Sequence, residues 1–216
     1  MVVVHYTAMQ SAQAAMKALC DPATEVSAHY LIAEDGEVLS LVPEDLRAWH
    51  AGAGRWGAVT DVNSHSIGIE LANSGSTPFS APQMDALVEL LKVVQARWTI
   101  SPERMIGHSD MAPGRKIDPG PRFDWRRLSV EGLSIWPSSS AGAHSSEEDP
   151  QGTDDARFAA AMVTFGYTAT DDPDLLLKIF RLRFRPGHHG PLDAVDLAMI
   201  ADLALRFPVD VKATWA

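Results

Sequence analysis

The sequence predicts an α/β fold, a mixed central sheet of about five strands flanked by helices, with a small C-terminal three-helix domain. Three observations predict it. Apolar and β-branched runs alternate with segments of helical periodicity over residues 1–136. A stretch rich in serine, glycine and acidic residues follows at 137–152, and three helical patterns follow that stretch. The 216 residues suffice for one ordinary domain and a small companion.

Five short apolar stretches supply the predicted strands. A turn signal, Glu34-Asp35-Gly36, separates the second stretch from the third, so these two form a hairpin. The valine run at the start of the chain is typical of a buried strand. The predicted strands are residues 2–4, 29–32, 37–42, 66–71 and 105–106.

Two helices are expected to flank this sheet. The longer one carries apolar residues at helical spacing from Leu87 to Trp98. Ser80 can cap its start, and Gln83 can reach back to Ser80, as in a capping box. A shorter helix over 11–19 fits the same role.

Three further helices are expected after the serine-rich stretch. The second begins with an Asp172 cap before Pro173, and the third begins at Asp193. About 60 residues form a marginal domain on their own, so this bundle should dock on the first domain. We therefore predict a catalytic domain at 1–136, a linker at 137–152 and a helical domain at 153–216. The apolar stripes are Phe158, Met162 and Phe165, then Leu175, Ile179 and Leu182, then Leu197, Ile200, Leu203 and Phe207.

Composition excludes several classes of function. Eighteen Lys and Arg against 28 Asp and Glu give a net charge of −10, which disfavours a nucleic-acid partner. The single cysteine, Cys20, excludes an internal disulfide and a four-cysteine zinc site. No apolar run approaches the roughly 20 residues of a membrane span. We expect a cytoplasmic monomer, or a periplasmic or outer-membrane lipoprotein if a leader was removed.

Two histidines and an aspartate predict a metal site. His5 and His108 each stand where a predicted strand ends, and Asp118 follows His108 by ten residues. A catalytic zinc ion takes three protein ligands of these types and keeps one position open. A single histidine at a strand end is more often structural, but the three together favour one zinc ion per chain.

A carboxylate and an ammonium group accompany these candidate ligands. Glu70 lies on a predicted buried strand, where a carboxylate is costly unless it has a partner or a task, and a general base is such a task. Lys116 lies two residues before Asp118, so an extended segment would turn both side chains to one side, where Lys116 could stabilise an oxyanion. The alternative for Lys116 is a loop cation paired with Asp118 or Asp110.

Aromatic residues follow the hairpin in a loop that contains glycine. Trp49 and His50 are adjacent, and Trp56 is near them in sequence. Rings on loops beside a metal site form platforms for sugar or peptide groups. The alternative is a core position, which is somewhat commoner for a tryptophan such as Trp49.

Five motifs in order resemble the zinc-dependent N-acetylmuramoyl-L-alanine amidases of the amidase type 2 family. The likeness is closest to the branch that contains amidase D and the recycling amidase, and it covers residues 1–136. The C-terminal helices look like the small peptidoglycan-binding domain of some of these enzymes. The motifs are VHYTAM (4–9), VSAHYLI (26–32), RAWHAG (47–52), SIGIE (66–70), and GHSD (107–110) with PGRKIDPG (113–120).

The resemblance implies a role for each matching residue. His5, His108 and Asp118 would bind zinc, and Glu70 and Lys116 would form the catalytic pair. The expected substrate-binding residues are His50, Trp49, Asn73 and Tyr30.

The resemblance also implies the reaction. The expected cleavage is at the amide between the lactyl group of N-acetylmuramic acid and the first L-alanine of the stem peptide. The substrate would be peptidoglycan or a muropeptide, in cell-wall turnover or recycling. The alternatives are a catalytically silent peptidoglycan-recognition module and a hydrolase of an amide within the stem peptide. Removal of residues 150–216 is predicted to leave the chemistry intact and to weaken binding to the wall.

Overall fold

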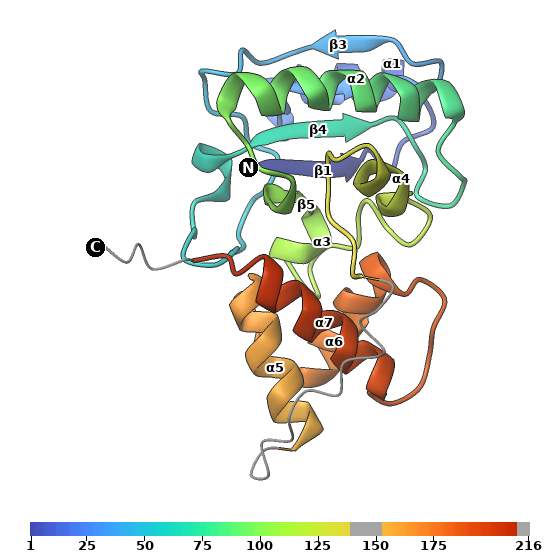
Figure 1. The fold of residues 1–216 in the computed structure, drawn as a ribbon. Helices are drawn as coiled ribbons and strands as arrows, with labels where there is room; N and C mark the ends of the chain where they lie inside the picture. The colour runs from blue at the N-terminus through green and yellow to red at the C-terminus, as the bar shows by residue number, and fades with distance from the viewer. Residues whose placement is uncertain (139–152, 211–216) are drawn as a thin grey trace.

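The computed structural model describes residues 1–138 and 153–210. At its centre is a five-stranded sheet in the order β3-β2-β4-β1-β5 (Figure 1). β3 pairs antiparallel with β2 at one edge, and the other neighbours run parallel, so the predicted hairpin and mixed sheet are confirmed. The strands are β1 (Val2–Tyr6), β2 (Tyr30–Ile32), β3 (Val38–Ser40), β4 (Ile67–Leu71) and β5 (Met105–Gly107).

Alternation along β1 separates an apolar face of the sheet from the face that carries His5. Val2 and Val4 pack against the apolar side of α2 (Ala81–Trp98). Val3 points into a different apolar cluster, so His5, two residues later, lies on that same side, away from α2. α2 crosses one face of the sheet, and α1 (Ala12–Leu19) lies behind the sheet in the same view (Figure 1).

Serine caps begin both helices, and the cap at Ser80 was predicted. Ser11 Oγ and Ser80 Oγ each accept a hydrogen bond, at 3.2 Å, from the backbone N–H three residues further on. The capping-box role of Gln83 is wrong. Its side chain is buried, and Nε2 donates to the carbonyls of Ile32 at 2.9 Å and Ala72 at 3.1 Å, at the ends of β2 and β4. An unpaired buried carbonyl destabilises the fold more than an unpaired N–H at an exposed helix end. The Gln83 amide therefore bonds to the carbonyls rather than to the start of the helix.

The C-terminal part forms the three expected helices, α5 (Asp154–Phe165), α6 (Pro173–Phe184) and α7 (Ala194–Arg206). Asp172 and Asp193 cap α6 and α7, as predicted. The apolar stripe predicted for α6 is too narrow. Leu176, Phe180 and Phe184 are buried together with Ile179, because α6 contacts both α5 and α3 (His108–Met111). The remaining helices are α4 (Trp125–Val130), η1 (Pro22–Thr24), η2 (Val62–His65) and η3 (Pro102–Arg104).

One hydrophobic cluster joins the bundle to the sheet. It contains Val3 and Ile106 of the sheet and Phe180 of α6. Trp56 lies fully buried in it, edge-on to Phe165 and Tyr167 at ring-centre distances of 5.7 and 4.9 Å. Trp56 is therefore a core residue rather than part of a substrate platform.

The predicted linker falls largely outside the described part of the chain, which resumes at residue 153. The domain boundaries themselves stay a prediction. Within residues 1–138 and 153–210, no helix combines the length and the apolar character that a membrane crossing requires.

Phe180→Ala is expected to lower the free energy of unfolding by about 3–5 kcal/mol, because the ring is fully buried against Phe158 and Phe184. The cluster spans both parts of the chain, so unfolding in urea should remain a single transition by tryptophan fluorescence and by far-UV circular dichroism. Leu205→Ala, at a side chain 83% exposed, should change stability by less than about 0.5 kcal/mol. Two separate transitions in the Phe180→Ala protein would contradict the shared core.

Candidate metal centre and active site

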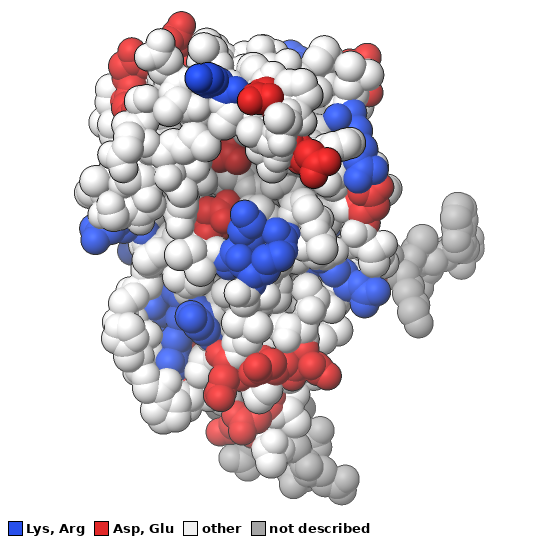
Figure 2. Space-filling model, turned by 180° about the vertical axis from the view of Figure 1, so that it is seen from behind, with Lys and Arg blue, Asp and Glu red and all other residues white. Residues whose placement is uncertain are grey.

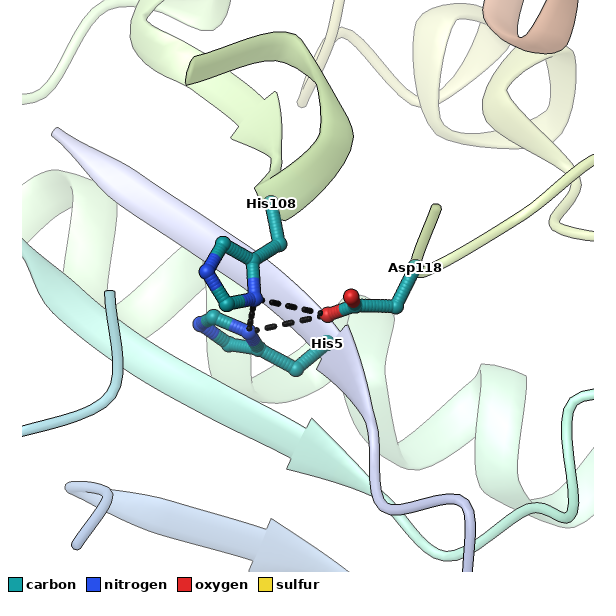
Figure 3. Close-up of side chains that lie close together, drawn as sticks. All are labelled: His5, His108 and Asp118. Atoms are coloured by element: carbon teal, nitrogen blue, oxygen red, sulfur yellow. Dashed lines mark hydrogen bonds and ion pairs between the residues drawn. The ribbon is translucent and has the colours of Figure 1, made fainter. Parts of the chain in front are cut away.

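Three side chains from distant segments meet at the ends of the central strands. His5 comes from β1, His108 is the first residue of α3 directly after β5, and Asp118 lies in the following loop (Figure 3). The two Nδ1 atoms are 2.8 Å apart, and each lies 3.0 Å from Asp118 Oδ2. All three side chains are buried. Because β1 and β5 are parallel neighbours, their carboxyl ends bring the two imidazoles together.

The three groups fit a zinc ion in spacing and in charge. Sides of 2.8 to 3.0 Å are shorter than twice a Zn–N or Zn–O bond of about 2.0–2.2 Å, so one ion can contact all three atoms. Burial, together with the neighbouring His108, lowers the pKa of His5 to about 4, which keeps the ring neutral. Burial alone would raise the pKa of Asp118, but hydrogen bonds with His108 and His5 outweigh it and hold that pKa below its ordinary value. Neutral imidazoles and an ionised carboxylate are zinc ligands.

A chain of hydrogen bonds behind His5 fixes its tautomer. His5 Nε2 lies 3.0 Å from His50 Nδ1, and His50 Nε2 lies 3.3 Å from Ser66 Oγ, which donates to the carbonyl of Val62. If His5 presents the lone pair of Nδ1 to the cluster, its Nε2–H donates to His50, whose own Nε2–H donates to Ser66. Burial and three neighbouring histidines lower the pKa of His50 well below its ordinary value, which agrees with this neutral relay.

Gly68 makes room for this relay. A β-carbon at position 68 would lie 2.3 Å from His50 Cγ, closer than any real contact. The absence of a side chain at Gly68 therefore lets the His50 ring lie close to β4, beside His5.

The second imidazole ligand is fixed by a backbone carbonyl. His108 Nε2 lies 2.8 Å from the carbonyl oxygen of Ala51, which leaves Nδ1 facing the cluster. Arg115 Nη2 donates to the same oxygen at 2.6 Å and to the carbonyl of Ala53 at 2.5 Å. Arg115 thus holds the loop that orients His108. No role was predicted for Arg115, although it is the cation adjacent to Lys116 in the last motif.

Glu70 lies beside the cluster, on the strand next to that of His5. It is paired in register with His5 across β1 and β4, so both side chains leave the same face of the sheet. Glu70 Oε2 is buried and has no hydrogen-bond partner among the described residues. Burial, with the nearby charge of Asp118, raises the pKa of Glu70 to about 8, and Lys116 lowers it. A carboxylate with a raised pKa and a free oxygen is suited to proton transfer.

These groups line one cavity of about 470 Å³. Its floor contains the three cluster residues with Glu70 and Lys116, and α1 supplies an apolar wall. An adjoining cavity of about 300 Å³ shares His50, Lys116 and Arg115 with the first and extends to Trp49. On the face opposite to that of Figure 1, basic side chains gather at the centre beside recessed acidic ones (Figure 2). A further cavity of about 490 Å³, against Met1, contains no cluster residue.

The structure decides the alternatives for Lys116 and Trp49. Within the described residues, Lys116 forms no ion pair with Asp118 or Asp110, because His5 and His108 hold Asp118 and Arg183 pairs with Asp110. Lys116 lines the same cavity as Asp118. Trp49 is 52% exposed, so the core alternative is wrong for this residue.

Two predicted substrate-binding residues lie away from the cluster. Asn73 lines a separate cavity of about 350 Å³, and its Nδ2 donates to the carbonyls of Thr77 and Pro78 at 3.3 Å. The Tyr30 hydroxyl donates to Glu44, and the Tyr30 ring packs on the α2 side of the sheet. Tyr30 belongs to a matching motif, but alternation along β2 turns its side chain to the opposite face from His5.

Comparisons with known proteins agree with this geometry. The family described as N-acetylmuramoyl-L-alanine amidase matches residues 1–121. The N-acetylmuramoyl-L-alanine amidase AmiD of Escherichia coli (strain K12) is 33% identical over 97% of this chain and 83% of its own length. The 1,6-anhydro-N-acetylmuramyl-L-alanine amidase AmpD of Enterobacter cloacae is 45% identical over 48% of this chain and 55% of its own length.

Two solved structures are similar over nearly the whole chain. E. coli AmiD in complex with the substrate anhydro-N-acetylmuramic acid-L-Ala-D-gamma-Glu-L-Lys matches with a TM-score of 0.86 and 32% identity, covering 97% of this chain and 90% of that one. AmpDh3 from Pseudomonas aeruginosa in complex with an anhydromuramic pentapeptide matches with a TM-score of 0.83 and 30% identity, covering 97% and 92%.

Glu70→Gln is expected to stabilise the metal-free protein at pH 9 by roughly 1–3 kcal/mol and to have almost no effect at pH 5. The pKa of about 8 in the folded state exceeds the ordinary 4.5, so the folded state holds this proton more tightly than the unfolded state. The free energy of unfolding of the unaltered protein therefore falls as the pH rises from about 4.5 to about 8. The side chain of the Glu70→Gln protein is an uncharged amide, so its burial does not depend on pH in this way. Urea denaturation with chelator present at both pH values measures the difference, and a pH-independent difference would contradict the assignment.

Proposed function

As a member of the N-acetylmuramoyl-L-alanine amidase family, this chain is an amidase of the bond between N-acetylmuramic acid and L-alanine, and we propose that it works as a zinc hydrolase. The observation that carries the proposal is the meeting of His5, His108 and Asp118 in the same cavity as the unpartnered oxygen of Glu70.

His5 Nδ1, His108 Nδ1 and Asp118 Oδ2 are the atoms that would hold one zinc ion per chain. Zinc with three such ligands supplies Lewis-acid chemistry, which acidifies water and polarises a carbonyl group. The hydrogen bonds to His50 and to the carbonyl of Ala51 keep both imidazoles in the tautomer whose Nδ1 can bind the ion.

Glu70 transfers the proton in this proposal. Its buried Oε2 accepts a proton from the water that attacks the amide carbonyl, and it returns that proton to the leaving nitrogen of L-alanine. Because the pKa of Glu70 is raised, its carboxylate is a stronger proton acceptor than an exposed glutamate.

Lys116 stabilises the negative charge that develops on the carbonyl oxygen. Its ammonium group faces both adjoining cavities, and no carboxylate within the described residues forms an ion pair with it. It is therefore available to donate a hydrogen bond to the oxyanion.

A muropeptide is the substrate class that we infer. The similar solved structures of AmiD and AmpDh3 are complexes with anhydromuramic peptides. The two joined cavities supply an apolar wall from α1 on one side and an exposed Trp49 with Arg115 on the other, which suits a ligand with both a peptide and a sugar part. Every residue assigned to the site comes from one chain, so we infer that a monomer is competent.

Incubation of the zinc-loaded protein with an anhydro-N-acetylmuramyl tripeptide is expected to release the free stem peptide, detected by mass spectrometry. Chelation should abolish release, and added zinc should restore it. No release from the zinc-loaded protein would favour a recognition module. A fragment with L-alanine still attached to the sugar would indicate cleavage of a different amide.

His108→Ala and Asp118→Ala are expected to lose bound zinc, whereas Glu70→Ala should keep a full equivalent of zinc and lose turnover by about 10²–10⁴-fold. Elemental analysis after dialysis gives the zinc content, and the muropeptide assay gives the rate. His65→Ala, at an exposed histidine outside both cavities that meet at the cluster, should retain both properties. Full zinc occupancy in the His108→Ala protein would overturn the ligand assignment.

A further inference from the structure

We propose that Arg183 and Tyr167, in the C-terminal helical part, are positioning residues of the active site that act through Asp110 on the backbone carrying His108. The inference rests on the proposed function, because it assigns His108 to the zinc site. It differs from the prediction that removal of the C-terminal part leaves the chemistry intact.

Asp110 holds the turn from which His108 projects. It lies two residues after His108 in α3, and its side chain is almost completely buried. Its Oδ2 accepts the backbone N–H of Gly107, the residue before His108, at 2.7 Å. The carboxylate thus closes a short loop around His108 and restrains the backbone on both sides of it.

Two groups from the C-terminal part bind this carboxylate. Arg183 Nη1, on α6, lies 2.9 Å from Asp110 Oδ2, and both side chains are at most 2% exposed. The Tyr167 hydroxyl, in the segment between α5 and α6, donates to Oδ1 at 2.6 Å. The orientation of Asp110 therefore depends on residues more than 50 positions further along the chain.

Arg183 is itself fixed by the sheet domain. Its Nη2 donates to the carbonyl of Met105 on β5 at 3.0 Å, and its guanidinium lies 4.2 Å from the centre of the Trp125 ring. One side chain thus connects the strand that precedes His108 with the helix that begins at His108.

Stability alone does not explain this ion pair. Taking two charges out of water costs several kcal/mol per ion, and well-packed apolar residues often stabilise a protein equally well. What apolar residues cannot supply is a directional set of hydrogen bonds that holds one backbone geometry at Gly107 and Met105. We therefore assign the pair to positioning.

Arg181 provides a matched control on the same helix. It forms an equally buried ion pair with Asp196, and its other hydrogen bonds go to the carbonyls of Gly190 and Pro191. All of its partners lie in the C-terminal part. Loss of Arg181 should therefore disturb the bundle without a direct effect on His108.

The test compares Arg183→Met with Arg181→Met in the full chain. Zinc dissociation constants come from competition with a chromophoric chelator, and melting temperatures are measured in parallel. Both variants should melt at lower temperature, but only Arg183→Met should bind zinc more weakly, by about 10–100-fold. Arg183→Lys keeps the charge without the planar fork and should fall between Arg183→Met and the unaltered protein.

Tyr167→Phe serves if Arg183→Met does not fold, because it removes one hydroxyl and keeps the ring. Its zinc affinity should fall by roughly threefold. At saturating zinc, the kcat for muropeptide hydrolysis should fall in Arg183→Met and in Tyr167→Phe. The KM should change little, since neither Arg183 nor Tyr167 lines the two cavities at the cluster.

The outcomes separate this inference from the proposed function. Equal zinc affinities for Arg183→Met and Arg181→Met, or an unchanged affinity for Tyr167→Phe, would overturn the positioning role. If the unaltered protein binds zinc but hydrolyses no muropeptide, the proposed function fails, while the comparison of zinc affinities still decides the role of Arg183.

Discussion

Asp118 lies buried between two imidazoles, and much of the site follows from the need to compensate its charge. A carboxylate removed from water requires a compensating partner, and a zinc ion held between Asp118, His5 and His108 would supply one. Those rings are buried in turn and require their own partners, which are His50 and the carbonyl of Ala51. The residues around the cluster thus provide the hydrogen-bond partners that the buried imidazoles require. Among the residues that the structure describes, the buried Oε2 of Glu70 has no hydrogen-bond partner, and that oxygen is the proton acceptor in our proposal.

Much of the fold and the candidate ligands could be predicted because they depend on local patterns. Strand alternation, the hairpin turn and the helix caps are local, and a histidine at a strand end already points to an edge of the sheet. The cluster of His5, His108 and Asp118 also lies together as the sequence predicts.

Long-range contacts explain what could not be predicted. Gln83 does not form the predicted capping box, because its side-chain amide donates to the carbonyls of Ile32 and Ala72, which are distant in sequence. Nothing in the sequence around Asp110 indicates that its partner is Arg183, 73 residues away. Tyr30 lies in a matching motif and Asn73 follows one by three residues, but their side chains make other contacts, because a place in or near a motif does not fix the direction of a side chain.

The pairing of β1 with β4 places His5 and Glu70 directly opposite each other. Their separation is set by the spacing of neighbouring strands, about 4.8 Å, rather than by any loop. Strand pairing therefore fixes the distance between the backbones of His5, the proposed metal ligand, and Glu70, the proposed base. A change in the length of the loop between β1 and α1, for example, would leave the distance between these two backbone positions unaltered.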